Sequence, residues 1–472
     1  MDSSAVVGAL DAELKSPRDR AFLGHPSGLG YLAFTEAWER FSFYGMQALL
    51  VLYMVDRLLL PGHVEHVLGF AALKRALEAV FGPMSVQALS SQVFGLYTAL
   101  VYVTPVLGGI VGDRWLGRRG AVILGAVLMA AGHFMMAFEA SFLLALTALI
   151  VGGGLMKGNI AVQLGALYGP GDIRRDQAFQ MFVMAINIGA IASPLVCGTL
   201  GEVYGFHYGF AAAGVGMVIG LLTYLAGRSH LPPEAPRAVR TAAAVPRTPL
   251  TRAERRAVIA ILALMPIFAL VMCGNNQSFN VGVLWWRQAM DLDLFGFHMP
   301  VTWLLSFTAV LAVLGLGIGV IVWRRLAARG IAPSELMKIT IGAGLAVLQM
   351  VVKAGFAFAA VSFGWKIPLL CMPIWELIGV AAFVCYYPTG LALVSRAAPR
   401  QLAGALFGGF LLYTVATNFL VGWIGAYYQP LGPTLFWLLH GALAAVSLAA
   451  LLIAYRPLAR ALGEPEPELL GA

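Results

Sequence analysis

The sequence predicts an all-α, polytopic membrane protein with twelve transmembrane helices. Hydrophobic residues make up 60% of the 472 residues and charged residues only 11%, less than half of the roughly 25% typical of soluble domains. Apolar runs near or above the roughly 20 residues that cross a bilayer recur along the chain. They do not alternate as the short strands of a transmembrane barrel do. This composition argues against a soluble enzyme and against a nucleic-acid partner.

Twelve apolar runs, bounded by charged or turn-forming residues, are predicted to span the lipid bilayer. They cover residues 29–55, 91–112, 120–138, 141–168, 178–199, 207–228, 257–286, 300–323, 336–362, 367–395, 401–428 and 431–455. With the N-terminus inside, 23 of the 31 Lys and Arg residues fall on the inner side, five fall outside and three lie within spans. Because cytoplasmic loops accumulate Lys and Arg, both termini are predicted to be cytoplasmic. The net charge of +8 is explained by this topology.

A basic, proline-bearing segment at 229–256 is predicted to be a cytoplasmic linker between the sixth and seventh spans. It divides the chain into a cytoplasmic segment at 1–28, a six-helix bundle at 29–228, a second bundle at 257–455 and a cytoplasmic tail at 456–472. Two six-helix bundles joined in this way are typical of the major facilitator fold, in which the substrate binds between the halves.

Charged residues in the first and fourth spans form the strongest candidate site. A charge at the bilayer centre costs roughly 2.5–3.5 kcal/mol on insertion scales, so such residues usually serve a function. Glu36, Glu39 and Arg40 share one helix face, which Tyr44 continues. Their surplus negative charge is expected to attract Lys157. Such a cluster can couple a proton to a conformation or to a carboxylate ligand; the alternative is a static ion-pair lock.

A glycine-rich stretch at 107–112 ends in Asp113 and Arg114, followed by Arg118 and Arg119. Glycines let helices approach closely, and the charges that follow predict a cytoplasmic gate between helix ends. No metal-ligand cluster, catalytic triad or phosphate-binding loop is found in the sequence. We therefore expect no enzymatic activity, no metal and no cofactor.

Four motifs resemble those of the proton-dependent oligopeptide transporter (POT) family, a branch of the major facilitator superfamily. Residues 36–46 (EAWERFSFYGM) resemble its first-helix ExxER motif, and 108–114 (GGIVGDR), 155–159 (LMKGN) and 182–190 (FVMAINIGA) are similar to motifs of helices two, four and five. The resemblance implies a monomeric symporter of a bacterial inner membrane. It would import di- and tripeptides with protons by alternating access, driven by the proton gradient alone.

The resemblance also implies roles for individual residues. Proton coupling is implied for Glu36, Glu39 and Lys157. Binding of the peptide's carboxylate and backbone is implied for Arg40, Tyr44, Tyr102, Lys157 and Asn187.

The second half departs from the family pattern at the acids of helices seven and ten. Cys273 and Phe383 occupy those positions, and Glu376 lies seven residues before Phe383, about 10 Å away along the helix axis. Glu376 either receives the peptide's amino group or forms an interhelical lock. Gln47 replaces a basic residue common in relatives, and 229–256 is too short and polar for the two helices that some members insert.

Two alternative functions remain open from the sequence. A diverged family member could carry another carboxylate-bearing solute, because the second-half pocket is altered. A non-transporting membrane receptor that keeps the fold is the other alternative.

Overall fold

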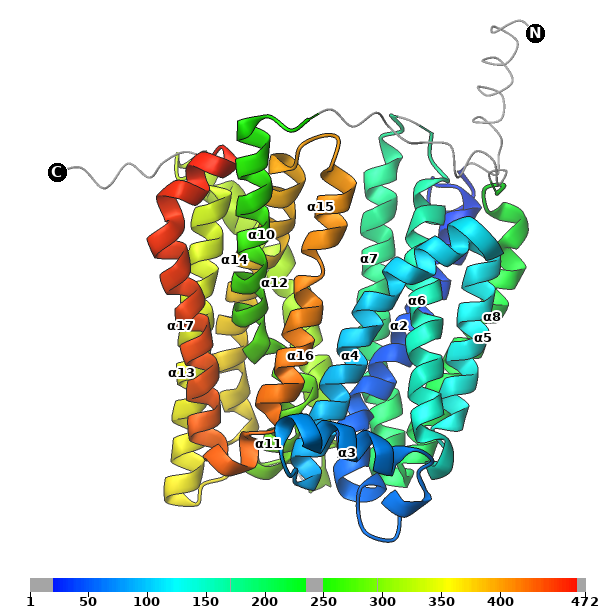
Figure 1. Ribbon diagram of the computed structural model, residues 1–472, viewed down its shortest axis with the longest axis vertical. Helices are drawn as coiled ribbons and strands as arrows, with labels where there is room; N and C mark the ends of the chain where they lie inside the picture. Colours follow the sequence, from blue (N-terminus) through cyan, green and yellow to red (C-terminus); the bar gives the residue numbers. More distant parts are fainter. Residues whose placement is uncertain (1–19, 170, 235–248, 295, 465–472) are drawn as a thin grey trace, which may run out of the picture. The chain divides into compact units, whose positions relative to one another are not determined.

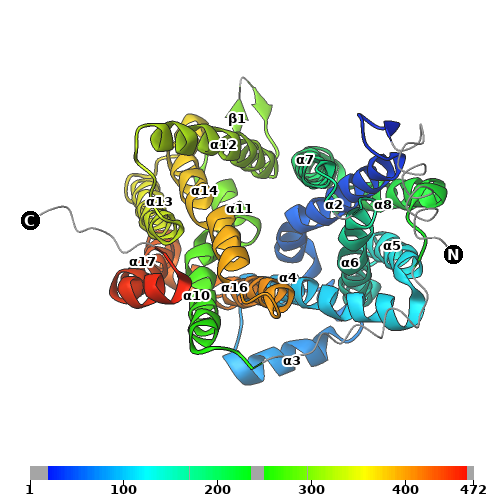
Figure 2. The same cartoon turned by 90° about the horizontal axis from the view of Figure 1, so that it is seen from above.

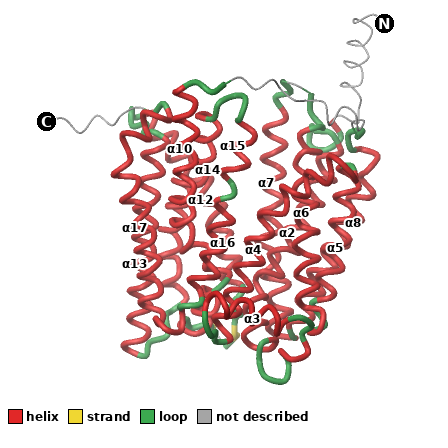
Figure 3. The backbone as a smooth tube through the Cα atoms, viewed as in Figure 1, coloured by secondary structure: helices red, strands yellow, loops and turns green. Residues whose placement is uncertain are grey.

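A computed structural model describes residues 20–169, 171–234, 249–294 and 296–464. Nearly all of this backbone is helical, with short loops between the helices (Figure 3). The helices, coloured along the chain in Figure 1, are α2 (Ser27–Tyr53), α3 (Phe70–Phe81), α4 (Val86–Val111), α5 (Arg118–Met135), α6 (Phe142–Gly165), α7 (Arg174–Ser193), α8 (Phe206–Gly227), α10 (Arg252–Asn276), α11 (Val281–Ala289), α12 (Trp303–Ala328), α13 (Glu335–Phe363), α14 (Met372–Ala397), α15 (Ala403–Phe410), α16 (Tyr413–Gly425) and α17 (Tyr428–Leu462).

A short antiparallel hairpin follows α11. Its strands are β1 (Asp293–Leu294) and β2 (Phe297–His298), with Asp293 opposite His298 and Leu294 opposite Phe297. Helices α2, α4 and α7 continue into turns of π-helix at their C-terminal ends, which are Met54–Leu58, Gly112–Leu116, Pro194–Gly198 and Leu200–Tyr204.

The prediction of an all-α membrane protein is confirmed. Ten helical segments of the described chain are long and apolar enough to cross a membrane. Helices α2 and α5 coincide with the first and third predicted spans but are not among the ten. Each carries charged side chains, which lower its mean hydropathy. Each of the twelve predicted spans therefore corresponds to helical structure.

Two predicted spans are interrupted, although each was expected as one continuous run. In the seventh, a 3-10 turn (Gln277–Phe279) and an irregular residue, Asn280, separate α10 from α11. The side-chain amides of Gln277 and Asn280 both donate to the C=O of Val421 on α16, each at 3.1 Å. In the eleventh, two residues separate α15 from α16. Breaks at membrane depth are tolerated where neighbouring helices satisfy the polar groups.

The chain divides into two compact units. Unit 1 comprises residues 1–49 and 103–243, and unit 2 comprises 50–102 and 244–472, so α2 and α4 contribute residues to both. Within unit 1, α5 packs against α6 and α8; within unit 2, α13 packs against α14 and α17 (Figure 2). The predicted linker lies partly outside the described residues. The predicted tail begins inside α17, which continues to Leu462.

Small residues bring α4 and α16 into close contact within unit 2. A Cβ built on Gly95 would lie against the backbone of Gly422 and Asn418, and one on Gly425 would meet the side chain of Ser91. Close approach through small residues is a common means of helix association in membranes.

Replacing Gly95 with alanine is therefore expected to destabilise the protein. Overpacking of a well-packed contact costs about 1–3 kcal/mol, and the obstacle here is backbone rather than a flexible side chain. Thermal unfolding of the detergent-solubilised protein measures the effect. Gly408→Ala on α15 is the control, since nothing lies within 4 Å of its added carbon. Equal midpoints for the two variants would contradict the close packing.

Candidate functional site

Three charged residues on one face of α2 form the centre of the candidate site. Arg40 Nε donates to Glu36 Oε1 at 2.9 Å and lies 2.7 Å from Glu39 Oε2. The exposed fractions are 4% for Glu36, 0% for Glu39 and 8% for Arg40. The Glu39 contact lacks hydrogen-bond alignment, and no described group donates to either of its oxygens. Two buried carboxylates therefore share one guanidinium.

Lys157 on α6 belongs to the same cluster. Its ammonium nitrogen is buried, lies 3.9 Å from the centre of the Phe43 ring, and interacts electrostatically with Glu36 and Glu39. Helix α6 is held close to α4 in this region, because a Cβ on Gly154 would meet Thr104. Glycine-mediated packing thus holds α6, the helix that carries Lys157, against α4.

Tyr44 and Asn187 lie near this cluster in unit 1. Tyr44 is one turn beyond Arg40 on α2 and is hydrogen-bonded to it. Asn187 lies on α7, where its side-chain nitrogen donates to the C=O of Val183 at 2.8 Å. Gly189 brings α7 close to α2, since a Cβ there would lie 2.9 Å from the Cβ of Arg40.

Tyr102 and Glu376, the other predicted substrate contacts, lie in unit 2. Tyr102 on α4 is 38% exposed and interacts electrostatically with Tyr413 on α16. Glu376 on α14 is 2% exposed. Its Oε1 lies 3.6 Å from Lys353 Nζ on α13 and accepts a hydrogen bond from the Trp375 indole at 3.0 Å.

The ion pair between Lys353 and Glu376 is enclosed by aromatic rings. Lys353 Nζ lies 4.6 Å from the ring centre of Trp437 and 5.8 Å from that of Trp286, and both charged side chains are almost fully buried. No described group accepts a hydrogen bond from Lys353 Nζ. The Glu376 carboxylate is therefore paired with a cation on a neighbouring helix.

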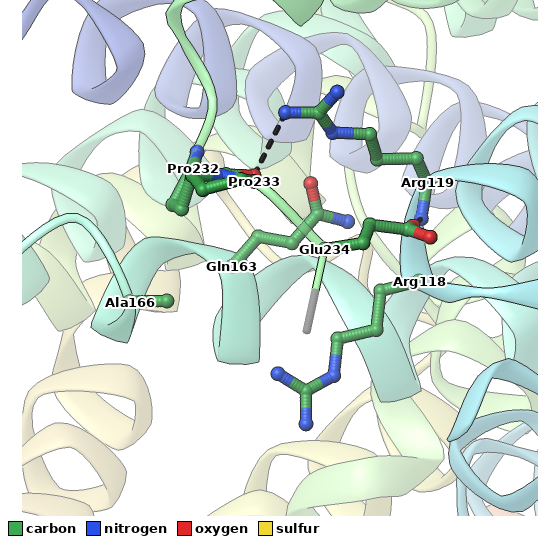
Figure 4. Close-up of a pocket in the computed structure, with 7 residues that line it drawn as sticks. All are labelled: Arg118, Arg119, Gln163, Ala166, Pro232, Pro233 and Glu234. Carbon is green, nitrogen blue, oxygen red and sulfur yellow. Dashed lines mark hydrogen bonds between the residues drawn. The ribbon is translucent and has the colours of Figure 1, made fainter. Parts of the chain in front are cut away.

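The predicted gate residues lie in the π-helical turn after α4. Asp113 Oδ1 accepts from Arg118 Nε at 3.1 Å, and Arg114 lies on the same turn. Nearby, the segment after α8 packs onto the N-terminus of α5 around a cavity of about 370 Å³ (Figure 4). Arg119 donates from its guanidinium to Leu231 and Pro232 and from its backbone N–H to Glu234.

Three contacts were missed by sequence reasoning. Phe43 carries the aromatic face against Lys157, Lys353 is the partner of Glu376, and Glu234 accepts from the first turn of α5. A helical wheel placing Phe43 one turn beyond Glu39 could have indicated the first. The other two pair residues that are far apart in the sequence, for which spacing holds no signal.

Among the described residues, no group of three or more His, Cys, Asp or Glu side chains could hold a metal ion. The cluster of Glu36, Glu39, Arg40 and Lys157 instead contains two acids and two bases that can exchange a proton or accept an anionic ligand in place of a carboxylate.

Comparison with known proteins shows similarity to membrane transporters. The sequence profile of the POT family matches residues 119–243 and 237–430. The peptide transporter YePEPT of Yersinia enterocolitica is 28% identical over 530 residues, covering 94% of this chain and 96% of the relative. The uncharacterized transporter YclF of Bacillus subtilis is 27% identical, covering 91% and 94%. A di-/tripeptide transporter of Lactococcus lactis is 36% identical over 256 residues, covering 54% and 46%.

Solved structures show the same similarity. A crystal structure of a peptide transporter in complex with sulfate superposes with a TM-score of 0.78 at 27% identity, covering 93% of this chain and 96% of that one. A transporter in complex with a thioalcohol-conjugated peptide gives a TM-score of 0.74 at 25% identity, covering 93% and 98%.

Proposed function

Because the chain belongs to the POT family, we propose that it is a symporter that imports di- and tripeptides together with protons. The proposal rests chiefly on one observation: Glu36, Glu39, Arg40 and Lys157 are gathered in the interior of unit 1. Buried ionisable groups in a membrane protein usually mark an ion or substrate pathway. Relatives named as peptide transporters support the substrate class.

In the proposed mechanism, the charge cluster alternates between two pairings. With Glu36 and Glu39 ionised, Arg40 and Lys157 balance them. When one acid takes up a proton, a positive charge is released and becomes available to the carboxylate of a peptide. Tyr44, Tyr102 and Asn187 would hydrogen-bond the peptide backbone, as implied by the family resemblance. Closure between the two halves would then carry peptide and proton inward.

We further propose that the protein lies in a bacterial inner membrane with both termini cytoplasmic and acts as a monomer. The excess of Lys and Arg in the predicted inner loops supports this orientation. It would place the turn of Asp113 and Arg114 at the cytoplasmic side as a gate. Two further spans would need about 40 residues, more than the stretch between α8 and α10 provides. We therefore infer that the inserted helix pair of some relatives is absent.

Uptake into proteoliposomes tests the proposed function. With an inward proton gradient, vesicles that contain the protein are expected to accumulate labelled dialanine, and collapse of the gradient with an uncoupler should abolish the accumulation. Uptake equal to that of protein-free vesicles would sink the proposal.

A second candidate function is transport of a different carboxylate-bearing solute. It is favoured by the engagement of Glu376 with Lys353, because that acid is then not free to receive an α-amino group. A panel of dipeptides, single amino acids and organic acids competing with the labelled substrate distinguishes the two. Stronger competition by an organic acid than by any dipeptide would favour the alternative.

A further inference from the structure

An open cavity of about 630 Å³ in unit 2 combines a cation with several amide groups. It lies where the first turn of α17, the end of α11 and the start of α4 meet. Its lining includes Gln87, Leu284, Arg287, Gln288, Tyr428 and Gln429. We refer to it as the Arg287 cavity.

The guanidinium group of Arg287, which lines the cavity, is paired with the carboxylate of Asp56. Arg287 donates from both terminal nitrogens to the two oxygens of Asp56, with 2.9 Å between Nη2 and Oδ1. This two-pronged geometry is the one that arginine uses for any carboxylate. About a third of each side chain is exposed, at 35% and 32%. Exposed pairs of this kind contribute little stability, so a ligand carboxylate in solution can compete with Asp56.

A buried acceptor without a donor also lines the cavity. Gln87 is 4% exposed, and its Nε2 donates to Ser91 Oγ at 2.8 Å and to the C=O of Gly425 at 3.0 Å. The contact with a carbonyl fixes which end of the amide is nitrogen. No described group donates to the remaining atom, Gln87 Oε1. Buried polar atoms are nearly always hydrogen-bonded to protein or water, so this oxygen is available to accept from a water molecule or from the N–H group of a ligand.

The remaining polar wall is held in place. Tyr428 OH donates to Gln288 Oε1 at 3.0 Å, which leaves the amide nitrogen of Gln288 as a donor. The left-handed backbone at Gly432, with φ of 69°, turns α17 away at the cavity rim. The cavity thus offers fixed donors beside Arg287 and an acceptor at Gln87.

We propose that the Arg287 cavity is a second binding site for small zwitterionic peptides, with the peptide carboxylate on Arg287 and a peptide N–H group on Gln87 Oε1. The proposal rests on the proposed function for the substrate class. It is separate from the charge cluster of unit 1 and needs no residue of that cluster. In the proposed orientation the cavity faces the outside, where a peptide would arrive first.

Thiol protection tests the site without requiring transport. Gln429→Cys places an accessible thiol at the cavity, because Gln429 is exposed and lines it. Dialanine is expected to slow modification of that thiol by at least about tenfold at saturation. Ala76→Cys on the exposed side of α3 is the matched thiol control and should be unaffected. The unsubstituted protein gives the background from Cys371, the native cysteine that is not buried.

Two comparisons identify the ligand chemistry. Arg287→Gln in the Gln429→Cys background should abolish protection, whereas Arg57→Gln, which removes an exposed arginine from the turn that carries Asp56, should not. Dialanine amide, which lacks the carboxylate, should protect at least about tenfold more weakly, as expected for loss of one charge-assisted contact.

The outcomes separate this site from the proposed function. Absence of protection by dialanine, or equal protection by acetate alone, would overturn the peptide site while leaving proton-driven uptake to be judged by the vesicle assay. Protection that depends on Arg287 in a protein that does not accumulate dialanine would keep the site and overturn the proposed function.

Discussion

Replacing Lys157 with alanine is expected to abolish proton-driven peptide accumulation while leaving peptide exchange across the membrane. The ammonium group interacts with the buried carboxylates of Glu36 and Glu39. In the proposed mechanism, protonation of one of these acids releases the ammonium group, and Lys157→Ala removes that group altogether. Coupling free energies between sites are typically about 1–3 kcal/mol. Driven accumulation should therefore fall at least about tenfold, to near the protein-free level, whereas counterflow of labelled dialanine at equal pH should persist.

The controls for this prediction separate charge from position. Lys74→Ala on α3 removes a cation that is half exposed and should leave driven uptake unchanged. Glu39→Gln, which imitates the protonated acid at a fully buried position, should reproduce the effect of Lys157→Ala. Because both residues belong to one cluster, the double variant should be no worse than either single variant. Full driven uptake in either single variant would refute the coupling role.

Breaking the ion pair between Lys353 and Glu376 is expected to cause the largest loss of stability. Lys353→Met leaves the Glu376 carboxylate, 2% exposed, without its counter-charge. Removing one partner of a buried pair costs about 3–5 kcal/mol, whereas replacing both by apolar residues of similar volume is often neutral. The unfolding midpoint of the Lys353→Met variant should fall by several degrees, and Lys353→Met with Glu376→Leu should recover most of the loss.

A control on the same helix makes this comparison specific. Lys338 lies at the other end of α13 and is only partly buried. Its ammonium nitrogen is 4.9 Å from the ring centre of Trp323 on α12. Lys338→Met should therefore lower the free energy of unfolding by about 1 kcal/mol or less. The double variant at 353 and 376 also tests the role of Glu376. If Glu376 is an interhelical lock, the double variant should take up dialanine at a nearly normal rate. If Glu376 receives the peptide's amino group, the double variant should take up less dialanine even when the protein is stable.

Hydropathy was sufficient to predict the class of fold, because a helix that crosses a bilayer must be apolar over most of its length. The first span was identified in spite of Glu36, Glu39 and Arg40, since the residues around them are strongly apolar. The interruptions at Asn280 and before Tyr413 were not predicted. Neither site has a proline, and the side-chain bonds that accompany the first break come from packing against α16.

The candidate site was predicted where its members lie on one helix, and less well where they do not. The spacing of Glu36, Glu39 and Arg40 places them together because helical geometry fixes which residues share a face. No such rule connects Glu376 to Lys353, which lie on different helices and meet only because α13 packs against α14. Charge alone indicated that Glu376 needed a partner; packing decided which one.

The break between α10 and α11 has a consequence for how the protein is made. Gln277 and Asn280 donate to Val421, which follows them by more than 140 positions. A growing chain exposes its N-terminal segments first, so the seventh span is synthesised long before the acceptor on α16 exists. Until then, Gln277 and Asn280 have only each other and Ser91 as hydrogen-bond partners among the described side chains, and their bonds to Val421 are missing. The seventh span can therefore reach its final packing only after the eleventh has been synthesised. In chains truncated before residue 421, the segment around Asn280 should be less tightly packed.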